Sequence, residues 1–426
     1  MPLELTAILS TSFIKQTCSL QMPIVIEKDA LIIGGGIAGL WMLNRLRTEG
    51  YDVMLLEQNK LGAGQTIASQ GMIHGGIKYA LSGNLNTASE AIAEMPEHWK
   101  NCLAGKGDVD LRGTAVLSEH YYMWPRSSLR SRFNAFLGSK ALRGKVTSVA
   151  KKNYPAFFQT HIKGPLYELK DIVLDVPSLL ACLSKKHRAD IKFFDKRKWW
   201  SVEKNPAGEF KSLSMEHDNE TFTIKAKHLI VSSGEGSKDF LRKLIPDKEL
   251  PADMQMQLRP LQMTLVKHQH PDPIYVHCVA DQLSTTPEVT ITTHHCADGS
   301  SVWYLGGELA ESGAQRSQQE QIKIAQQKIS ELFPWCDFKK AEWSSFYINR
   351  AEALTKNGKR PETASIHQFK NISLCWPSKL TLAPELGQQI VTLFNEKNIK
   401  PAAYNNPELS RLSFPGIATP PWDAMP

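Results

Sequence analysis

Near the start of the chain, apolar residues are contiguous in one segment, recur with a helical period in the next, and are contiguous again in a third. Residues 30–33 form a short continuous apolar run, which predicts a buried strand. Residues 40–46 place apolar side chains on a helical period, and residues 51–56 form a second apolar run that ends at Glu57. This order of strand, helix and strand predicts a βαβ unit in an α/β protein.

Glycines occupy the turn between the first predicted strand and the helix. Gly34 permits a tight turn, Gly36 lets the backbone approach a pyrophosphate, and Gly39 lets helix and strand pack closely. Glu57 is placed to accept hydrogen bonds from a ribose 2′-hydroxyl. A glycine-rich turn in an ordinary α/β unit is the alternative reading. The candidate nucleotide contacts here are Gly34, Gly36, Ile37, Ala38, Gly39, Glu57 and Gln58.

Glycines and small polar residues continue from residue 61 to residue 79, a stretch too poor in large apolar side chains to build a core. The backbone N–H groups and short side chains of such a run can lie against a flat ligand. The candidate ligand contacts in it are Gln65, Thr66, Ser69, Gln70, Gly71, Met72, His74 and Gly75.

Downstream patterns predict the remaining elements. Helices are expected over residues 84–104 and 318–333, and another begins after Asp175. The predicted strands are residues 111–118, residues 228–232 running into a glycine turn, and the pair 289–293 and 302–306 joined by a turn at Asp298-Gly299.

Composition and charge change this picture little. The chain has 426 residues, of which 42% are hydrophobic, and a net charge of +7 from 50 basic and 43 acidic side chains. That excess is too small to indicate nucleic acid and fits an anionic cofactor or small substrate. No apolar run is long enough to cross a membrane. The first 21 residues lack the features of a signal peptide. Because Met22 lies just before the first strand, we expect them to be either an extension or the product of a misassigned start.

The seven cysteines are scattered and odd in number, which argues against a disulfide framework and for a reducing, cytoplasmic location. His294-His295-Cys296 is the one run that suggests metal, but no second ligand cluster lies near it in the sequence, so we expect no metal. The basic and aromatic segment 196–200 can contact a membrane surface, here the inner face, or an acidic partner. A solvated strand end is the stronger reading.

Four segments resemble a known family. Residues 73–79 (IHGGIKY) are similar to a loop of flavin-dependent glycerol-3-phosphate dehydrogenases, and of 2-hydroxy-acid and D-amino-acid oxidases. Ser233-Gly234 resembles a dipeptide that lies against FAD in this superfamily. Lys379-Leu380-Thr381 looks like the dehydrogenases' segment beside the flavin, and residues 381–384 (TLAP) look like the oxidases'. The resemblance therefore implies FAD as the cofactor.

The resemblance also implies a fold and a division of the chain. The fold is a Rossmann-like α/β FAD-binding domain with an interleaved α+β substrate domain of one sheet plus helix. We expect residues 1–27 to be an extension, residues 28–110, 171–245 and 346–400 to form the FAD domain, residues 111–170 and 246–345 to form the substrate domain, and residues 401–426 to be a loosely packed tail or a partner-binding segment.

The implied chemistry is transfer of a hydride from a small hydroxy acid, amino acid or glycerol-phosphate-like substrate to flavin N5. His74 is the candidate base or flavin contact, and Tyr304 and Arg350 are candidates on the substrate side. Arg360 is an alternative anion-binding residue. Lys379, with Leu380 and Thr381, would face the flavin edge where negative charge develops.

Two matters stay open at the level of sequence. The electron acceptor that reoxidises the flavin is oxygen, a quinone or a protein. The alternative function is a flavin-fold protein that acts on a macromolecule such as RNA, or that binds FAD only as a structural element. The lack of a strong basic stripe argues against RNA.

Overall fold

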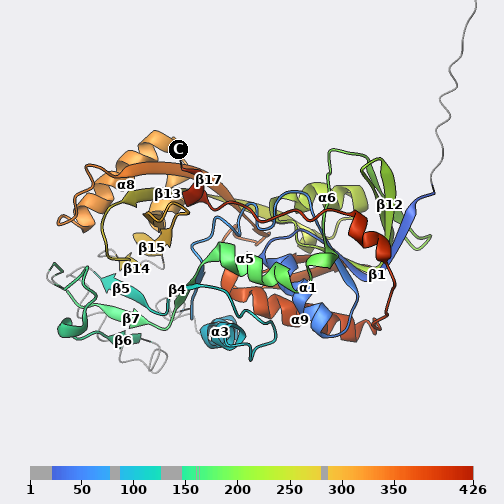
Figure 1. Ribbon diagram of the computed structural model, residues 1–426, viewed down its shortest axis with the longest axis horizontal. Helices are drawn as coiled ribbons and strands as arrows, with labels where there is room; N and C mark the ends of the chain where they lie inside the picture. Colours follow the sequence, from blue (N-terminus) through green and yellow to red (C-terminus); the bar gives the residue numbers. More distant parts are fainter. Residues whose placement is uncertain are drawn as a thin grey trace, which may run out of the picture.

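The computed structural model describes residues 22–76, 87–125, 146–159, 161–162, 164–279 and 286–425, with side chains omitted for residues 87–91. Two large sheets lie toward opposite ends of an elongated molecule (Figure 1). A small third sheet, of β3 (Met72–Ile73), β8 (Ile172–Leu174) and β4 (Val116–Ser118), is formed by segments that join them. The predicted α/β fold with an added sheet-plus-helix region is confirmed.

The first sheet is built around β1 (Ile24–Ile33), which pairs in parallel with both β2 (Val53–Glu57) and β12 (Glu220–Val231). The order β10-β11-β12-β1-β2-β9 continues through an antiparallel edge. The last residues of β12 also pair in parallel with β19, which in turn pairs with β18. The remaining strands are β9 (Ile191–Phe193), β10 (Trp200–Lys204), β11 (Phe210–His217), β18 (Ser365–Phe369) and β19 (Ile372–Trp376).

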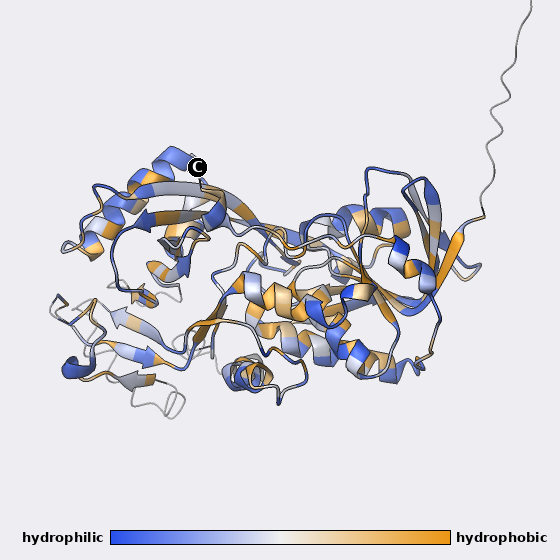
Figure 2. Cartoon of the chain, in the orientation of Figure 1, coloured by the Kyte–Doolittle hydropathy of each residue, from blue (hydrophilic) through white to orange (hydrophobic). Residues whose placement is uncertain are grey.

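Both faces of this sheet are covered, as a parallel core requires. Ala30 and Ile32 of β1 pack on one face with α1, α5 and α9, while Leu31 and Ile33 pack on the other face with α6. Figure 2 shows hydrophobic residues concentrated where α1 and α5 meet the sheet. The helices are α1 (Ile37–Thr48), α3 (Thr87–Leu103), α5 (Val176–Lys185), α6 (Ser237–Leu244) and α9 (Ala383–Glu396).

The second sheet has the order β17-β13-β16-β15-β14-β5-β7-β6 and is mostly antiparallel. The predicted hairpin is confirmed: β15 pairs with β16, and Gly299 in their turn has φ +83°. Helix α8 packs on this sheet. The elements are β5 (Tyr121–Pro125), β6 (Val146–Ser148), β7 (Tyr167–Leu169), β13 (Met256–His268), β14 (Val276–Val279), β15 (Val289–His295), β16 (Ser301–Gly306), β17 (Glu342–Ala353), α7 (Glu308–Gly313) and α8 (Gln318–Leu332).

Short 3₁₀ helices lie in the connections. They are η2 (Lys151–Asn153), η3 (Arg188–Asp190), η4 (Gly234–Gly236), η5 (Ala252–Met254), η6 (Leu380–Leu382), η7 (Pro407–Arg411) and η8 (Pro421–Ala424). No helix among the described residues is long and apolar enough to span a membrane.

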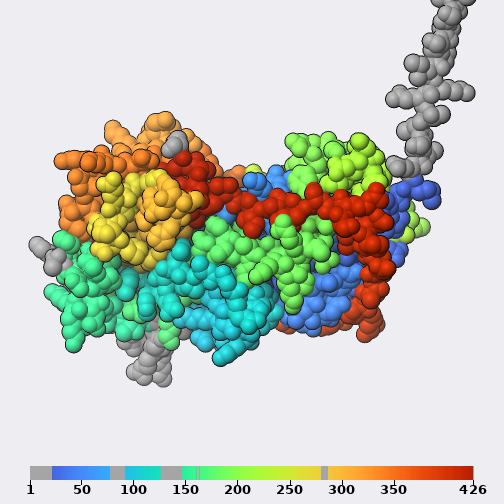
Figure 3. Space-filling view, in the orientation of Figure 1, coloured from blue at the N-terminus to red at the C-terminus, as the bar shows by residue number. Residues whose placement is uncertain are grey.

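Two expectations about the backbone were wrong. Of the strand predicted over residues 111–118, only β4 forms, because Gly113 (φ +102°) turns the chain before it. The segment after residue 400 does not pack loosely. It crosses from the first sheet to the second (Figure 3), where Trp422 is 3% exposed and its ring stacks on His294 at 4.0 Å. We call residues 401–425 the strap.

Candidate cofactor and active site

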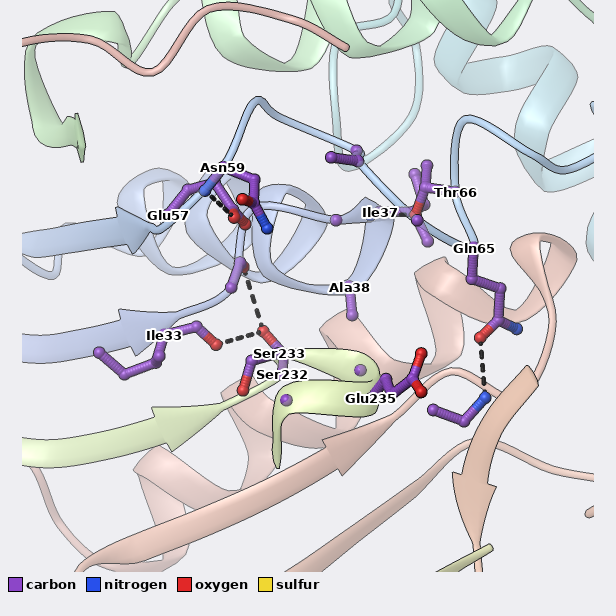
Figure 4. A pocket seen from close by; sticks show the side chains of 18 of the residues that line it. Ile33, Ile37, Ala38, Glu57, Asn59, Gln65, Thr66, Ser232, Ser233 and Glu235 are labelled. Atoms are coloured by element: carbon purple, nitrogen blue, oxygen red, sulfur yellow. Dashed lines mark hydrogen bonds between the residues drawn. The ribbon is translucent and has the colours of Figure 1, made fainter. Parts of the chain in front are cut away.

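A cleft of about 580 Å³ opens at the carboxyl ends of β1, β2, β12 and β19. This edge of a parallel sheet is where α/β folds bind their ligands, because loops and helix N-termini gather there. Figure 4 shows the glycine turn, the start of α1 and the turn after β12 around the cleft. The predicted site residues that line it are Gly34, Gly36, Ile37, Ala38, Glu57, Gln58, Gln65, Thr66, Ser69, Ser233, Gly234, Lys379 and Leu380.

Gly34 and Gly39 have the backbone roles that the sequence predicted. Gly34 has φ +111°, and a Cβ there would lie 2.6 Å from the carbonyl oxygen of Ser232. Gly39 does not line the cleft. A Cβ on it would lie 1.9 Å from the carbonyl oxygen of Gly34, so its absence is what lets α1 approach β1. Gly36 has no side chain to cap α1, although Thr66 accepts from the Ile37 N–H at 3.1 Å; the start of the helix lines the cleft and is suited to a phosphate.

Glu57 bridges the glycine turn and its own loop. Its carboxylate accepts hydrogen bonds from the backbone N–H groups of Gly35 at 2.6 Å and Asn59 at 2.7 Å. Burial raises the pKa of Glu57, and these N–H donors oppose the rise. The side chain is therefore fixed at the end of β2, where a ribose hydroxyl can reach it from the cleft.

The opposite wall comes from the turn after β12 and from β17. Ser232 donates its hydroxyl hydrogen to carbonyl oxygens of the β1 turn, and the Gln65 side chain accepts from the backbone N–H of Ala351 at 3.1 Å (Figure 4). Asn349 donates to Glu235 at 2.9 Å. These last two contacts join the second sheet to the cofactor loops at the rim of the cleft.

The rest of the glycine-rich loop lies behind the cleft. Gln70 donates to the carbonyl oxygen of Tyr304 at 2.8 Å, and so points into the second sheet. Gly71 has φ +70° and packs on β8, and Met72 belongs to β3. Gly75 donates its N–H to Asp171 at 2.9 Å. None of these residues lines the cleft.

The backbone of His74, a residue that does not line the cleft, contacts Thr381, two residues after Lys379. The backbone N–H of His74 donates to the Thr381 hydroxyl at 3.2 Å, and Trp99 donates its indole N–H to the Thr381 carbonyl oxygen at 3.0 Å. Thr381 is fully buried, while its neighbours Lys379 and Leu380 reach the cleft. Helix α9 begins just after them, with Pro384 in its first turn.

The two candidates from the second sheet lie elsewhere than expected. Tyr304 is fully buried and donates its hydroxyl hydrogen to the Ala68 carbonyl oxygen at 2.7 Å, and burial raises its pKa far above the usual range. It is therefore a packing residue. Arg350 lies on β17 between the cleft-lining residues Asn349 and Ala351, but its side chain turns to Glu311 on α7, 3.1 Å away.

Phe194, Lys196 and Trp200 line the far end of the cleft. Segment 196–200 was expected to be a solvated strand end, and residues 196–199 are indeed exposed, but the segment also forms part of the cleft wall. Trp200 stacks on Phe240 with ring centroids 5.4 Å apart, and Lys243 lies 3.9 Å above the Trp200 ring. Basic and aromatic residues at short spacing marked this end, but their spacing could not show that two of them face inward.

Comparisons with known proteins agree with this geometry. A model of the FAD dependent oxidoreductase family matches residues 29–362. A probable FAD-dependent oxidoreductase of Pseudomonas aeruginosa is 39% identical over 94% of this chain and 99% of its own. Its crystal structure superposes with a TM-score of 0.79, at 34% identity over 95% of this chain and 99% of that chain.

More distant structures share the fold. Glycine oxidase from Geobacillus kaustophilus has a TM-score of 0.61 at 14% identity, over 90% of this chain and 98% of its own. An L-alpha-glycerophosphate oxidase from Mycoplasma pneumoniae, solved with FAD bound, has a TM-score of 0.61 at 16% identity, over 87% of this chain and 95% of its own.

Proposed function

The chain belongs to the FAD-dependent oxidoreductase family, and on that premise we propose that it oxidises a small anionic molecule at a carbon bearing a hydroxyl or amino group. FAD is its cofactor, and when bound it supplies a flavin N5 that accepts a hydride. The glycine turn, the start of α1 and Glu57 are the residues that would hold it.

The observation that carries the anionic substrate is a cluster of arginines on β13, β17 and the loop after β17, which adjoins the cleft-lining residues Asn349 and Ala351 without itself lining the cleft. Arg259 on β13 and Arg350 on β17 are directly opposed. Burial raises the pKa of Glu311, but the nearby charges of Arg350, Arg360 and Arg259 lower it, and the net effect is a lowered pKa. Glu352 binds Arg259 at 2.7 Å, so three guanidinium groups face two carboxylates. A substrate carboxylate or phosphate would neutralise the third positive charge, and arginine binds either group with two parallel hydrogen bonds.

Residues on the other side of the cleft would assist the reaction. We assign Lys379 and the start of α9 to the place where negative charge accumulates during reduction, because an ammonium and a helix N-terminus both favour it. His74, held beside them through Thr381, is the candidate proton acceptor, since imidazole exchanges protons near neutral pH.

The test is anaerobic reduction of the purified flavoprotein, followed as loss of flavin absorbance. The panel pairs compounds that carry a carboxylate or phosphate with analogues that lack that anionic group: glycerol 3-phosphate with glycerol, 2-hydroxyglutarate with its diamide, and glycine with 2-aminoethanol. We expect a compound with the anionic group to bleach the flavin and its analogue to do so at least tenfold less well. The variant Arg350→Met should raise the concentration for half-bleaching roughly tenfold, for one lost charge-assisted bond.

Arg197→Met is the matched control, because Arg197 is exposed and pairs only with the neighbouring Asp195. Equal bleaching by the two members of a pair would contradict the anionic substrate. A bound flavin that no small molecule bleaches would favour the macromolecular or structural alternative instead.

A further inference from the structure

Three side chains with metal-ligating atoms meet at the end of α3, away from the cofactor cleft. His98 and Cys102 are four residues apart, so they lie on one face of the helix. The loop after the helix brings Asp108 back to them. His98 Nε2 lies 2.8 Å from Asp108 Oδ1, and Cys102 Sγ lies 3.3 Å from the same oxygen. The three ligand atoms all lie within 4.8 Å of one another.

We propose that His98, Cys102 and Asp108 bind one zinc ion per chain, with a water molecule as the fourth ligand. Nitrogen, sulfur and oxygen are the atoms zinc takes in proteins, and three protein ligands with an open fourth position is a common arrangement. With zinc–ligand bonds of normal length the three atoms would stand roughly 3.3 to 3.6 Å apart. The two contacts to Asp108 Oδ1, at 2.8 and 3.3 Å, are shorter than or similar to this, and the His98 and Cys102 atoms lie within 4.8 Å of each other, so side-chain shifts alone can bring all three around one ion.

The surroundings of Asp108 leave one oxygen for the metal. His98 and Cys102 both contact Oδ1, whereas Arg45 Nε lies 3.1 Å from the other oxygen, Oδ2. Arg45 can therefore keep its contact while Oδ1 binds an ion. This is the role that outer-shell partners have around metal sites, where they orient a ligand without touching the metal.

The loop after α3 also contacts the Cys102 sulfur. Backbone N–H groups of Asp108 and Val109 donate hydrogen bonds to Cys102 Sγ. A Cβ at position 107 would lie 2.4 Å from Sγ, so Gly107 is required for the loop to pass this close. Such N–H donors stabilise a thiolate, the form that binds metal.

Access and charge are consistent with an ion that enters from solvent. The side chains of His98 and Asp108 are 35% and 21% exposed, and His98 also lines a surface hollow beside Lys100 and Asn101. Cys102 is fully buried and its thiol donates toward Asp108 Oδ1 at 3.3 Å, so the metal must displace that proton. This cost predicts a site weaker than a four-ligand structural zinc site.

The experiment uses the holoprotein, stripped of metal with a chelator that leaves FAD bound. Cobalt(II), a spectroscopic substitute for zinc, is added and the difference spectrum is recorded against metal-free holoprotein, so that flavin absorbance cancels. We expect one cobalt per chain, a sulfur-to-cobalt charge-transfer band, and displacement of that band by one equivalent of zinc. Calorimetric titration with zinc should give the same stoichiometry.

The variants His98→Gln and Cys102→Ser should each weaken zinc binding at least tenfold, and Cys102→Ser should abolish the charge-transfer band. Cys182→Ser is the control and should change neither, because Cys182 lies on α5 with only carbonyl oxygens near its sulfur. His98→Gln keeps the test decisive if Cys102→Ser does not fold, since His98 is partly exposed.

Two results would overturn the proposal. One is the absence of stoichiometric binding of either metal to the folded holoprotein. The other is binding that survives both His98→Gln and Cys102→Ser, which would place the ion elsewhere. Because metal binding is read from cobalt spectra and titration, the outcome does not depend on the substrate proposed above.

Discussion

The two large sheets differ in how they use their residues near the cleft. In the first sheet, parallel strands end at one edge, and the loops that follow them line the cleft directly. In the second sheet, β17 alternates: Asn349 and Ala351 face the cleft, and Arg350 between them faces α7. Glycines that allow close backbone approach define the cofactor side, whereas buried polar and ionic contacts define the other.

The largest expected effect tests the close packing of the first sheet. The methyl group added by Gly39→Ala would lie 1.9 Å from the Gly34 carbonyl oxygen, so α1 must separate from β1. We expect a loss of about 4 kcal/mol in the free energy of unfolding and loss of bound FAD. Urea denaturation and the flavin-to-protein absorbance ratio measure both.

Gly164→Ala is the control for that substitution. The nearest atom to its added methyl group is 3.5 Å away, an ordinary contact, so stability should change by less than about 0.5 kcal/mol. A Gly39→Ala protein that retains FAD and full stability would remove the proposed distinction between the two sheets.

The second effect tests the ionic contacts of the other sheet. Glu352 on β17 is fully buried and receives two hydrogen bonds from Arg259 on β13, at 2.7 and 2.9 Å. Glu352→Gln leaves the guanidinium without its charged partner, and we expect a loss of about 3 kcal/mol in urea unfolding. Glu408→Gln removes an exposed pair with Arg411 and should cost less than about 1 kcal/mol. Equal losses would show that burial of the pair is unimportant.

The third effect should be the same in both sheets. Burial lowers the pKa of His228 in β12 and of His294 in β15 to about 3. Between that value and about 6.5 the unfolded chain binds more protons than the folded one, so stability is full above pH 6.5 and falls as pH falls. Each histidine contributes a decrease of about 2 kcal/mol between pH 6.5 and 5.

Urea unfolding at several pH values measures this dependence. His228→Gln and His294→Gln should each reduce the slope by a similar amount. A slope that neither buried substitution alters would mean that other groups cause the acid sensitivity.

The smallest effect concerns the N-terminal cap of α8, the helix that packs on the second sheet. Ser317 caps α8: its hydroxyl oxygen accepts from the Glu320 N–H, and the Glu320 carboxylate accepts from the Ser317 N–H. Ser317→Ala should cost about 1 kcal/mol. Thermal unfolding measures it, with Ser410→Ala on the strap as the control, since Ser410 bonds only to a carbonyl oxygen one turn away. No change would mean that sheet contacts alone hold α8.

These contrasts explain what the sequence could predict. The βαβ unit, the 289–306 hairpin and α8 were predictable because spacing and turn residues are local signals. The turn from Gly34 to Gly39 was predictable for the same reason. Tyr304 and Arg350 were misplaced because alternation along a strand does not reveal which face meets the ligand. The strap and the meeting of Asp108 with His98 depend on tertiary packing, which leaves little trace in sequence.

The route of β19 and α9 has a consequence for biosynthesis. Both complete the first sheet's layer, yet they lie at residues 372–396, far along the chain from β1 at residues 24–33. A ribosome must therefore release nearly the whole polypeptide before the sheet can close over the cofactor cleft. Until then β12 lacks its partner β19 and α1 lacks the helix α9 that packs on it, so we expect FAD to load after translation and nascent chains to depend on chaperones.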